Sequence, residues 1–130
     1  MTPEKLIAMA KEAMTRAYAP YSGFQVGAAL LCGDGSVYTG CNIENASFGP
    51  TICAERTAVA KAVSEGHRDF VRIVVAGRSK DFCVPCGVCR QVLREFAPNM
   101  EVICLNGAGE EQVFTLPELL PHSFGPEYLA

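Results

Sequence analysis

Three stretches of the chain carry apolar residues at the 3.6-residue spacing of an amphipathic helix. The first begins with Thr-Pro at residues 2–3, a capping residue followed by proline at the first helical position, and ends before Pro20. The second covers about residues 53–65 and is followed by Gly66, which is a plausible stop. The third covers residues 86–96. These patterns predict three helices.

Short runs of small and apolar residues between these helices are typical of strands. Residues 24–31 and 37–41 flank Gly-Asp-Gly at residues 33–35, which predicts a β-hairpin. Because strands alternate with helices, we expect a central sheet with helices on both faces. The remaining predicted elements are strands at residues 71–76, 100–105 and 112–116, a helical turn at residues 117–120 and an irregular tail.

The whole chain, residues 1–130, is expected to form one domain, because no repeat or linker divides it. Its net charge is −3 and it has no cluster of Lys and Arg, which argues against a nucleic-acid partner. The N-terminus carries Glu4 and Lys5 where a signal peptide needs apolar residues. The longest apolar stretch, residues 26–32, is too short to span a bilayer. We therefore expect a cytoplasmic protein that does not act on membranes.

The chain has seven cysteines, an odd number, and in a reducing compartment these indicate metal ligands, nucleophiles or buried residues before disulfides. Cys86 and Cys89 are three residues apart at the predicted start of a helix, so both thiols can point at one spot. The helix dipole there favours thiolates. Cys53 begins another predicted helix and is the obvious third sulfur. Three protein ligands with an open fourth position are typical of a catalytic zinc.

A carboxylate stands beside these cysteines in the sequence. Glu55 follows Cys53 by two residues and is expected to lie near the metal without ligating it. Zinc lowers the pKa of a bound water towards ~7, which makes a hydroxide nucleophile. Glu55 can take the proton of that water and pass it to the substrate and the leaving group. Cys-Ala-Glu at residues 53–55, followed by Pro-Cys-Gly-Val-Cys at residues 85–89, matches the pattern of zinc deaminases.

Over nearly its whole length, the chain resembles the small homotetrameric cytidine deaminases. The segments that carry the resemblance are Ala-Pro-Tyr-Ser (19–22), Phe-Gln-Val-Gly-Ala-Ala-Leu (24–30), Gly-Cys-Asn-Ile-Glu-Asn-Ala-Ser (40–47), Cys-Ala-Glu-Arg-Thr-Ala (53–58), Pro-Cys-Gly-Val-Cys-Arg-Gln (85–91), Leu-Leu-Pro (119–121) and Phe124. The resemblance implies a three-layer α/β/α fold with a five-stranded mixed sheet. It also implies hydrolytic deamination of cytidine and 2′-deoxycytidine in pyrimidine salvage, by a homotetramer whose active sites are shared between subunits.

The same resemblance assigns roles to individual residues by matching positions. Cys53, Cys86 and Cys89 would bind one Zn²⁺ per subunit, and Glu55 would be the catalytic proton shuttle. Asn42 and Glu44 would hold the ribose hydroxyls, Phe24 would line the base pocket, and Phe124 would enter the site of a neighbouring subunit. The substrate contacts implied in this way are Phe24, Asn42, Glu44, Ala54 and Phe124.

The charge of the predicted zinc site gives Arg56 a role. Three thiolates and one Zn²⁺ sum to −1, which opposes the acidification of a bound water. Arg56 follows Glu55 and can donate hydrogen bonds to the cysteine sulfurs, which offsets this charge. We therefore expect Arg56 to support the ligands from outside the coordination shell, in agreement with the resemblance.

Other interpretations stay open on the sequence alone. Cys83 precedes Cys86 by three residues and could complete a four-sulfur structural zinc site, although the family has no ligand there and Glu55 would then be unused. A blasticidin-type deaminase shares both zinc motifs. Deaminases of deoxycytidylate, of polynucleotides or of tRNA adenosine typically bring a His ligand, which this motif lacks. Phe48 stands where relatives often carry Tyr, and the thiols expected to be small buried strand residues are Cys32, Cys41 and Cys104.

Overall fold

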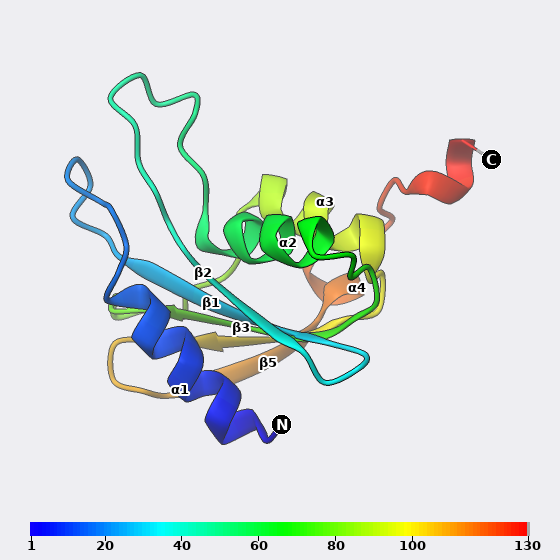
Figure 1. The fold of residues 1–130 in the computed structure, drawn as a ribbon, viewed down its shortest axis with the longest axis horizontal. Helices are drawn as coiled ribbons and strands as arrows, with labels where there is room; N and C mark the ends of the chain where they lie inside the picture. Colours follow the sequence, from blue (N-terminus) through cyan, green and yellow to red (C-terminus); the bar gives the residue numbers. More distant parts are fainter. Residues whose placement is uncertain (130) are drawn as a thin grey trace.

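A mixed five-stranded sheet separates one helix from two others in the computed structural model, which describes residues 1–129 (Figure 1). Helix α1 covers one face of the sheet, and helices α2 and α3 cover the other. In the sheet order β2-β1-β3-β4-β5, β3 and β4 are parallel and the other neighbours are antiparallel. The elements are α1 (Pro3–Met14), β1 (Val26–Cys32), β2 (Val37–Cys41), α2 (Ala54–Ser64), β3 (Phe70–Gly77), α3 (Gly87–Phe96), β4 (Glu101–Leu105), β5 (Glu111–Thr115), α4 (Leu116–Leu119) and a 3₁₀ turn (Pro126–Leu129).

The central strands bury side chains on both faces, which explains why they are almost continuously apolar in the sequence. Leu30 of β1 and Val75 of β3 pack under α2 and α3, whereas Ala29 and Val74 pack against α1. The alternation follows from the two-residue period of a strand. It produces two hydrophobic cores, one on each face of the sheet.

The predicted layout is confirmed, with small shifts in the bounds of the elements. The hairpin, the helices and the helical turn all form, and the sheet is mixed and five-stranded. Two details were wrong. Cys41 is half-buried rather than buried, because β2 is an edge strand, and the tail forms a 3₁₀ turn where none was predicted. Within residues 1–129, none of the helices combines the length and apolar character needed to cross a membrane.

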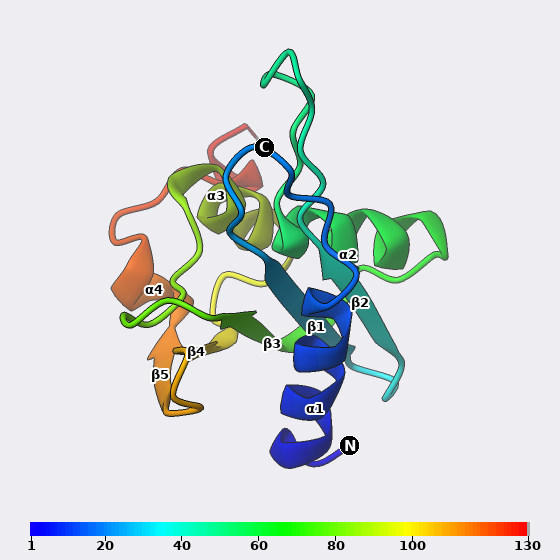
Figure 2. The ribbon, with the colours of Figure 1, turned by 90° about the vertical axis from the view of Figure 1, so that its left-hand side faces the viewer.

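Two loops extend beyond the same end of the sheet, residues 15–25 before β1 and residues 42–53 after β2 (Figures 1 and 2). Their bases are tied together: the backbone N–H of Tyr18 donates to the Asn42 carbonyl at 3.0 Å. Ile43 and Ile52 exchange two backbone hydrogen bonds of 2.9 and 3.0 Å across the second loop. The loops therefore form a joined rim next to the N-terminus of α2.

Helix α2 lies directly on strand β2 because Gly40 has no side chain. A Cβ at position 40 would lie 2.4 Å from the carbonyl oxygen of Ala54 and 2.6 Å from the backbone nitrogen of Ala58. Both atoms belong to the α2 backbone and have no flexible end that could move aside. The position of the α2 N-terminus therefore depends on this close approach.

We predict that Gly40→Ala lowers the free energy of unfolding by about 3 kcal/mol, the upper end of the usual cost of overpacking. Urea unfolding at one fixed protein concentration measures this change. Gly49→Ala is the matched control, because its Cβ would meet nothing closer than the Ser47 carbonyl oxygen at 4.0 Å. The control should change stability by less than about 0.5 kcal/mol. Equal urea midpoints for the two variants would contradict the close-packing argument.

Candidate metal centre

Three thiols from the starts of two helices meet at one place. Cys53 is the N-cap of α2, Cys86 is the N-cap of α3, and Cys89 lies in the first turn of α3. Their Sγ atoms lie within 4.8 Å of one another, and those of Cys53 and Cys86 are 3.9 Å apart. Neither N-cap thiol caps its own helix, so both are free to face the cluster. Cys83 does not belong to the cluster found among the described residues.

The cluster fits Zn²⁺ in its spacing and in its donor chemistry. Two sulfurs bound at 2.3 Å to a tetrahedral zinc are about 3.8 Å apart, close to the separation of Cys53 and Cys86. Thiolates are soft ligands that favour zinc over magnesium or calcium. Two helix N-termini add positive dipole ends, which stabilise negative charge on the sulfurs. Three sulfurs leave a fourth position for another ligand, as in catalytic sites.

Cys53 is the most acidic of the perturbed thiols. Its pKa is lowered to about 5, chiefly because the Cys89 thiol donates a hydrogen bond to it and next because Arg56 lies beside it. The Nη2 atom of Arg56 donates to the Cys53 sulfur at 3.6 Å. The pKa of Cys89 is raised, since it is the donor to Cys53 and is buried. The predicted contact between Arg56 and a cysteine sulfur is thus present.

Glu55 is a buried carboxyl group in the first turn of α2, with 4% of its surface exposed. Burial raises the pKa of Glu55 to about 7, because the carboxylate is poorly solvated there. A carboxyl group with such a pKa gives and takes protons easily near neutral pH. Its position one residue after Ala54 and two after Cys53 brings it to the wall of the same cleft that Cys53 lines.

A cleft of about 270 Å³ opens in front of the thiols. Its walls carry two carboxylates, and no Lys or Arg among the described residues. A second hollow of about 280 Å³, next to it, shares Ser22, Glu44 and Thr51 with the cleft and reaches Phe48. The predicted site residues that line the cleft are Phe24, Asn42, Glu44, Cys53, Ala54, Glu55 and Cys86.

Asn42 and Glu44 are held in place by the neighbouring loop. The Asn42 side chain accepts from the Val26 N–H and donates to the Phe24 carbonyl, both at 2.8 Å. Glu44 accepts from the N–H groups of Tyr21 and Ser22 at 3.0 and 3.1 Å, and from the Ser22 hydroxyl. The hydrogen bonds from Ser22 lower the pKa of Glu44, so its carboxylate stays ionised at neutral pH. Both side chains therefore organise the rim of the cleft as well as facing into it.

Three contributors to the site were not predicted. Ser22 anchors Glu44, and it belongs to the Ala-Pro-Tyr-Ser segment that carries the family resemblance. Arg90 follows Cys89 directly and donates to the carbonyls of Pro85 and Leu119 at 2.6 and 2.7 Å, which fixes the start of α3 against α4. Cys83 lines the cleft, but burial raises its pKa to about 12, so its thiol stays protonated.

Phe124 is the one predicted substrate contact that lies away from this cleft. It belongs to the tail after α4, is 54% exposed, and stacks on Tyr128 with 5.3 Å between ring centroids. It is not among the residues that line the cleft of its own chain. The structure therefore brings together every predicted site residue of the first 90 positions and leaves Phe124 outside.

Comparison with known proteins is consistent with this geometry. A cytidine deaminase of Halalkalibacterium halodurans is 53% identical over 98% of this chain and 97% of its own length. That of Sporosarcina psychrophila is 49% identical over 100% of this chain and 96% of its own. The crystal structure of cytidine deaminase from Burkholderia pseudomallei superposes with a TM-score of 0.92 at 48% identity, covering 95% of this chain and 100% of that one.

The zinc motifs and the fold also agree with one family description. Residues 1–105 match the family model described as the cytidine and deoxycytidylate deaminase zinc-binding region. The match includes the thiol cluster, Glu55 and the residues that line the cleft. The chain therefore belongs to the cytidine and deoxycytidylate deaminase family.

Proposed function

We propose that this protein hydrolyses cytidine and 2′-deoxycytidine to uridine and 2′-deoxyuridine with release of ammonia. One observation carries the proposal: a single cleft has the thiols and a buried carboxyl group on one side and the anchored Asn42 and Glu44 on another. Relatives with 53% and 48% identity are called cytidine deaminases, which supports the same substrate class. The physiological role we propose is pyrimidine salvage in the cytoplasm by a single catalytic domain.

Cys53, Cys86 and Cys89 would hold one Zn²⁺ in each subunit. When bound, the zinc supplies Lewis-acid chemistry that lowers the pKa of water to about 7. Arg56 offsets part of the negative charge of the three thiolates through its contact with Cys53. The Nε atom of Arg56 is buried without a hydrogen-bond partner among the described residues, which costs free energy. The guanidinium group therefore keeps its contact with the Cys53 sulfur at the expense of a hydrogen bond from Nε.

Glu55 would move the protons of the reaction. It delivers a proton to N3 of cytosine, which makes C4 a better electrophile for water. The proton taken from the attacking water then passes through the same carboxyl group to the amino group, which leaves as ammonia. Burial suits Glu55 to both directions of transfer, because its pKa of about 7 is close to the working pH.

Recognition of the sugar would fall to Asn42 and Glu44. Glu44 is ionised and can accept a hydrogen bond from a ribose hydroxyl, and hydrogen bonds to the loop hold both side chains ready. A substrate that lacks the matching hydroxyl leaves such groups unpaired, which gives selectivity. Phe24 is 41% exposed on the cleft wall and would pack against the base, beside the buried Ala54.

The complete site would need more than one subunit. The cleft is open, and apolar side chains that line it or the hollow next to it are exposed, among them Phe24 at 41% and Phe48 at 72%. Exposed apolar surface of this kind is typical of protein contact regions. We propose a homotetramer in which Phe124 of one subunit completes the cleft of another, as the family resemblance implies.

The first prediction concerns the substrate. Zinc-loaded protein should remove the ultraviolet absorbance of cytidine and deoxycytidine quickly, with little change for deoxycytidylate or blasticidin S. For deoxycytidylate the physical reason is charge, since the described residues that line the cleft include Glu44 and Glu55 but no cation to bind a phosphate. Zinc-loaded protein that fails on cytidine contradicts the roles of Asn42 and Glu44. Activity on one of the other two compounds would identify that compound as the substrate class, and no activity on any would favour a structural zinc site.

The second prediction separates catalysis from metal binding. Glu55→Gln keeps the size of the buried side chain but removes its acid–base function, so turnover of cytidine should fall about 10³-fold while zinc content is unchanged. Steady-state kinetics and metal analysis measure the two quantities. Glu65→Gln, at the exposed C-terminal end of the same helix, is the control and should keep full activity. If Glu55→Gln retains more than about a tenth of the rate, Glu55 is not the proton shuttle.

The third prediction concerns Arg56. Replacing Arg56 by Gln leaves the thiolate charge without its guanidinium partner, so zinc should leave about tenfold faster or turnover should slow by a similar factor, with the fold intact. Zinc transfer to a chromogenic chelator and activity per bound zinc are the measurements. Lys61→Gln is the control, because that cation lies on the same helix and donates to the Thr39 carbonyl instead. Normal zinc retention together with normal turnover would refute this role.

A further inference from the structure

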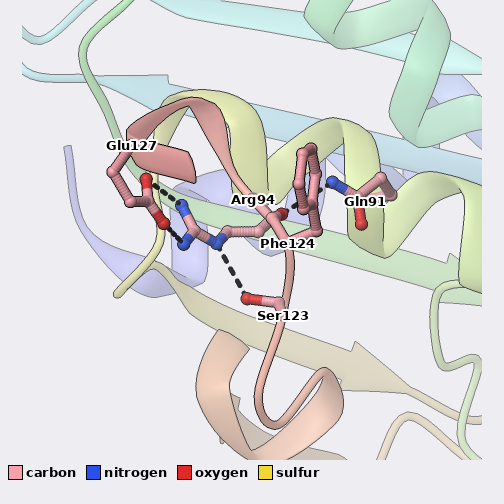
Figure 3. Close-up of polar contacts among 5 residues, drawn as sticks. All are labelled: Gln91, Arg94, Ser123, Phe124 and Glu127. Atoms are coloured by element: carbon pink, nitrogen blue, oxygen red, sulfur yellow. Dashed lines mark hydrogen bonds and ion pairs between the residues drawn. The ribbon is translucent and has the colours of Figure 1, made fainter. Parts of the chain in front are cut away.

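The C-terminal tail is held on α3 by two side chains of that helix (Figure 3). Arg94 forms an ion pair with Glu127 and donates from Nε to the Ser123 hydroxyl at 2.8 Å. Gln91, three residues earlier, donates from its amide to the carbonyl of Phe124 at 3.0 Å. Residues 91 and 94 lie on neighbouring turns of one helix face, so their side chains bind neighbouring residues of the tail.

Arg94 is the centre of this arrangement. Its side chain is only 11% exposed, although it carries a charge, and within residues 1–129 its hydrogen bonds go to Ser123 and Glu127. Gly125 is buried against it, and a Cβ at that position would lie 2.3 Å from Nη1 of Arg94. The tail therefore wraps closely round the guanidinium group on both sides of Phe124, which a loosely attached segment would not do.

The backbone of the tail is also set in one conformation. His122 has a φ of 53°, in the left-handed region that few residues other than glycine adopt, and this turns the chain towards Arg94. After Gly125 the 3₁₀ turn brings Tyr128 back onto the ring of Phe124, with 19° between the ring planes. Phe124 is 54% exposed, yet its ring stacks on Tyr128, its carbonyl accepts from Gln91, and Arg94 holds residues 123 and 127 on either side of it.

We propose that Arg94 is a positioning residue for substrate binding in a neighbouring subunit: its contacts with Ser123 and Glu127 hold Phe124 in the orientation that completes that subunit's cleft. This inference rests on the proposed function, in which Phe124 acts between subunits. Arg94 touches neither the substrate nor the thiols in this scheme. Without Arg94, the tail samples many orientations. The apparent affinity for substrate is then multiplied by the fraction of time in which Phe124 is correctly placed.

A double-mutant cycle between Arg94→Gln and Phe124→Ala tests the inference. Arg94→Gln should raise KM for cytidine about fivefold with little change in kcat, because it alters the population of the competent tail. In the Phe124→Ala background, which itself raises KM, adding Arg94→Gln should change KM less than about twofold. Additive effects of the two substitutions would overturn the proposal, since Arg94 would then act independently of Phe124.

Two further measurements separate positioning from a structural role. The chain has no Trp, so Tyr128→Trp provides a single reporter in the tail, and its fluorescence anisotropy should fall when Arg94→Gln is added. Zinc content should not change. Loss of zinc or of kcat with an unchanged KM would place the effect of Arg94 in α3 itself and overturn the proposal.

The controls keep the outcomes distinct. Arg72→Gln removes a comparable ion pair with Glu101, 2.5 Å long, on β3 and β4, and should lower stability without raising KM.

Glu127→Gln, at a residue whose side chain is 54% exposed, tests the same contact between Arg94 and the tail if Arg94→Gln fails to fold. This variant should also raise KM. An unchanged KM in both Arg94→Gln and Glu127→Gln, with a raised KM in Phe124→Ala, overturns only the positioning role of Arg94. An unchanged KM in Phe124→Ala overturns the role of Phe124 between subunits, and the positioning role of Arg94 with it.

Discussion

The direct contact between the backbone of α2 and strand β2 determines where the reactive groups of this protein lie. With only the hydrogen of Gly40 between them, the first turn of α2 is seated within a few ångströms of the sheet. That turn carries a thiol of the cluster at its N-cap, the buried carboxyl group two residues later, and the guanidinium group after that. Three chemical functions are therefore positioned by one packing contact and by the pitch of one helix.

The same packing places several groups that can carry negative charge close together. A buried carboxyl group lies beside three thiols, and each added negative charge raises the free energy of ionising the others. The hydrogen bond from the Cys89 thiol and then the Arg56 guanidinium lower the pKa of Cys53. The N-termini of α2 and α3 add positive dipole ends beside the sulfurs. Glu55 receives less of this support and keeps a raised pKa. The division places an ionised Cys53 sulfur, suited to binding a metal, beside a carboxyl group that exchanges protons near neutral pH.

Local spacing was enough to predict the pair Cys86 and Cys89 and the Cys-Ala-Glu motif, and the zinc-deaminase pattern joined them into one cluster. Contacts between the two loops at the rim could not be predicted. Cys86 and Cys89 share a helical turn, and the motif that contains Glu55 is equally local, so both are visible in the sequence. Hydrophobic periodicity shows which side chains are buried but not which strands are neighbours, so the mixed order of the sheet came from the family resemblance. The anchoring of Glu44 by Ser22 joins residues 22 positions apart, and no local pattern indicates that the two loops meet.

Helix α3 connects the thiol cluster with the C-terminal tail. Its N-cap and first turn supply two sulfurs of the cluster, and the following residues supply the side chains that hold the tail. One short helix thus supports both the metal site of its own subunit and the aromatic ring that would enter the site of a neighbour. Arg90 binds this helix to α4. Rigid elements support functional groups more accurately than loops do. In an assembly with shared sites, a shift of α3 would disturb two active sites at once, so accurate packing of this helix serves both.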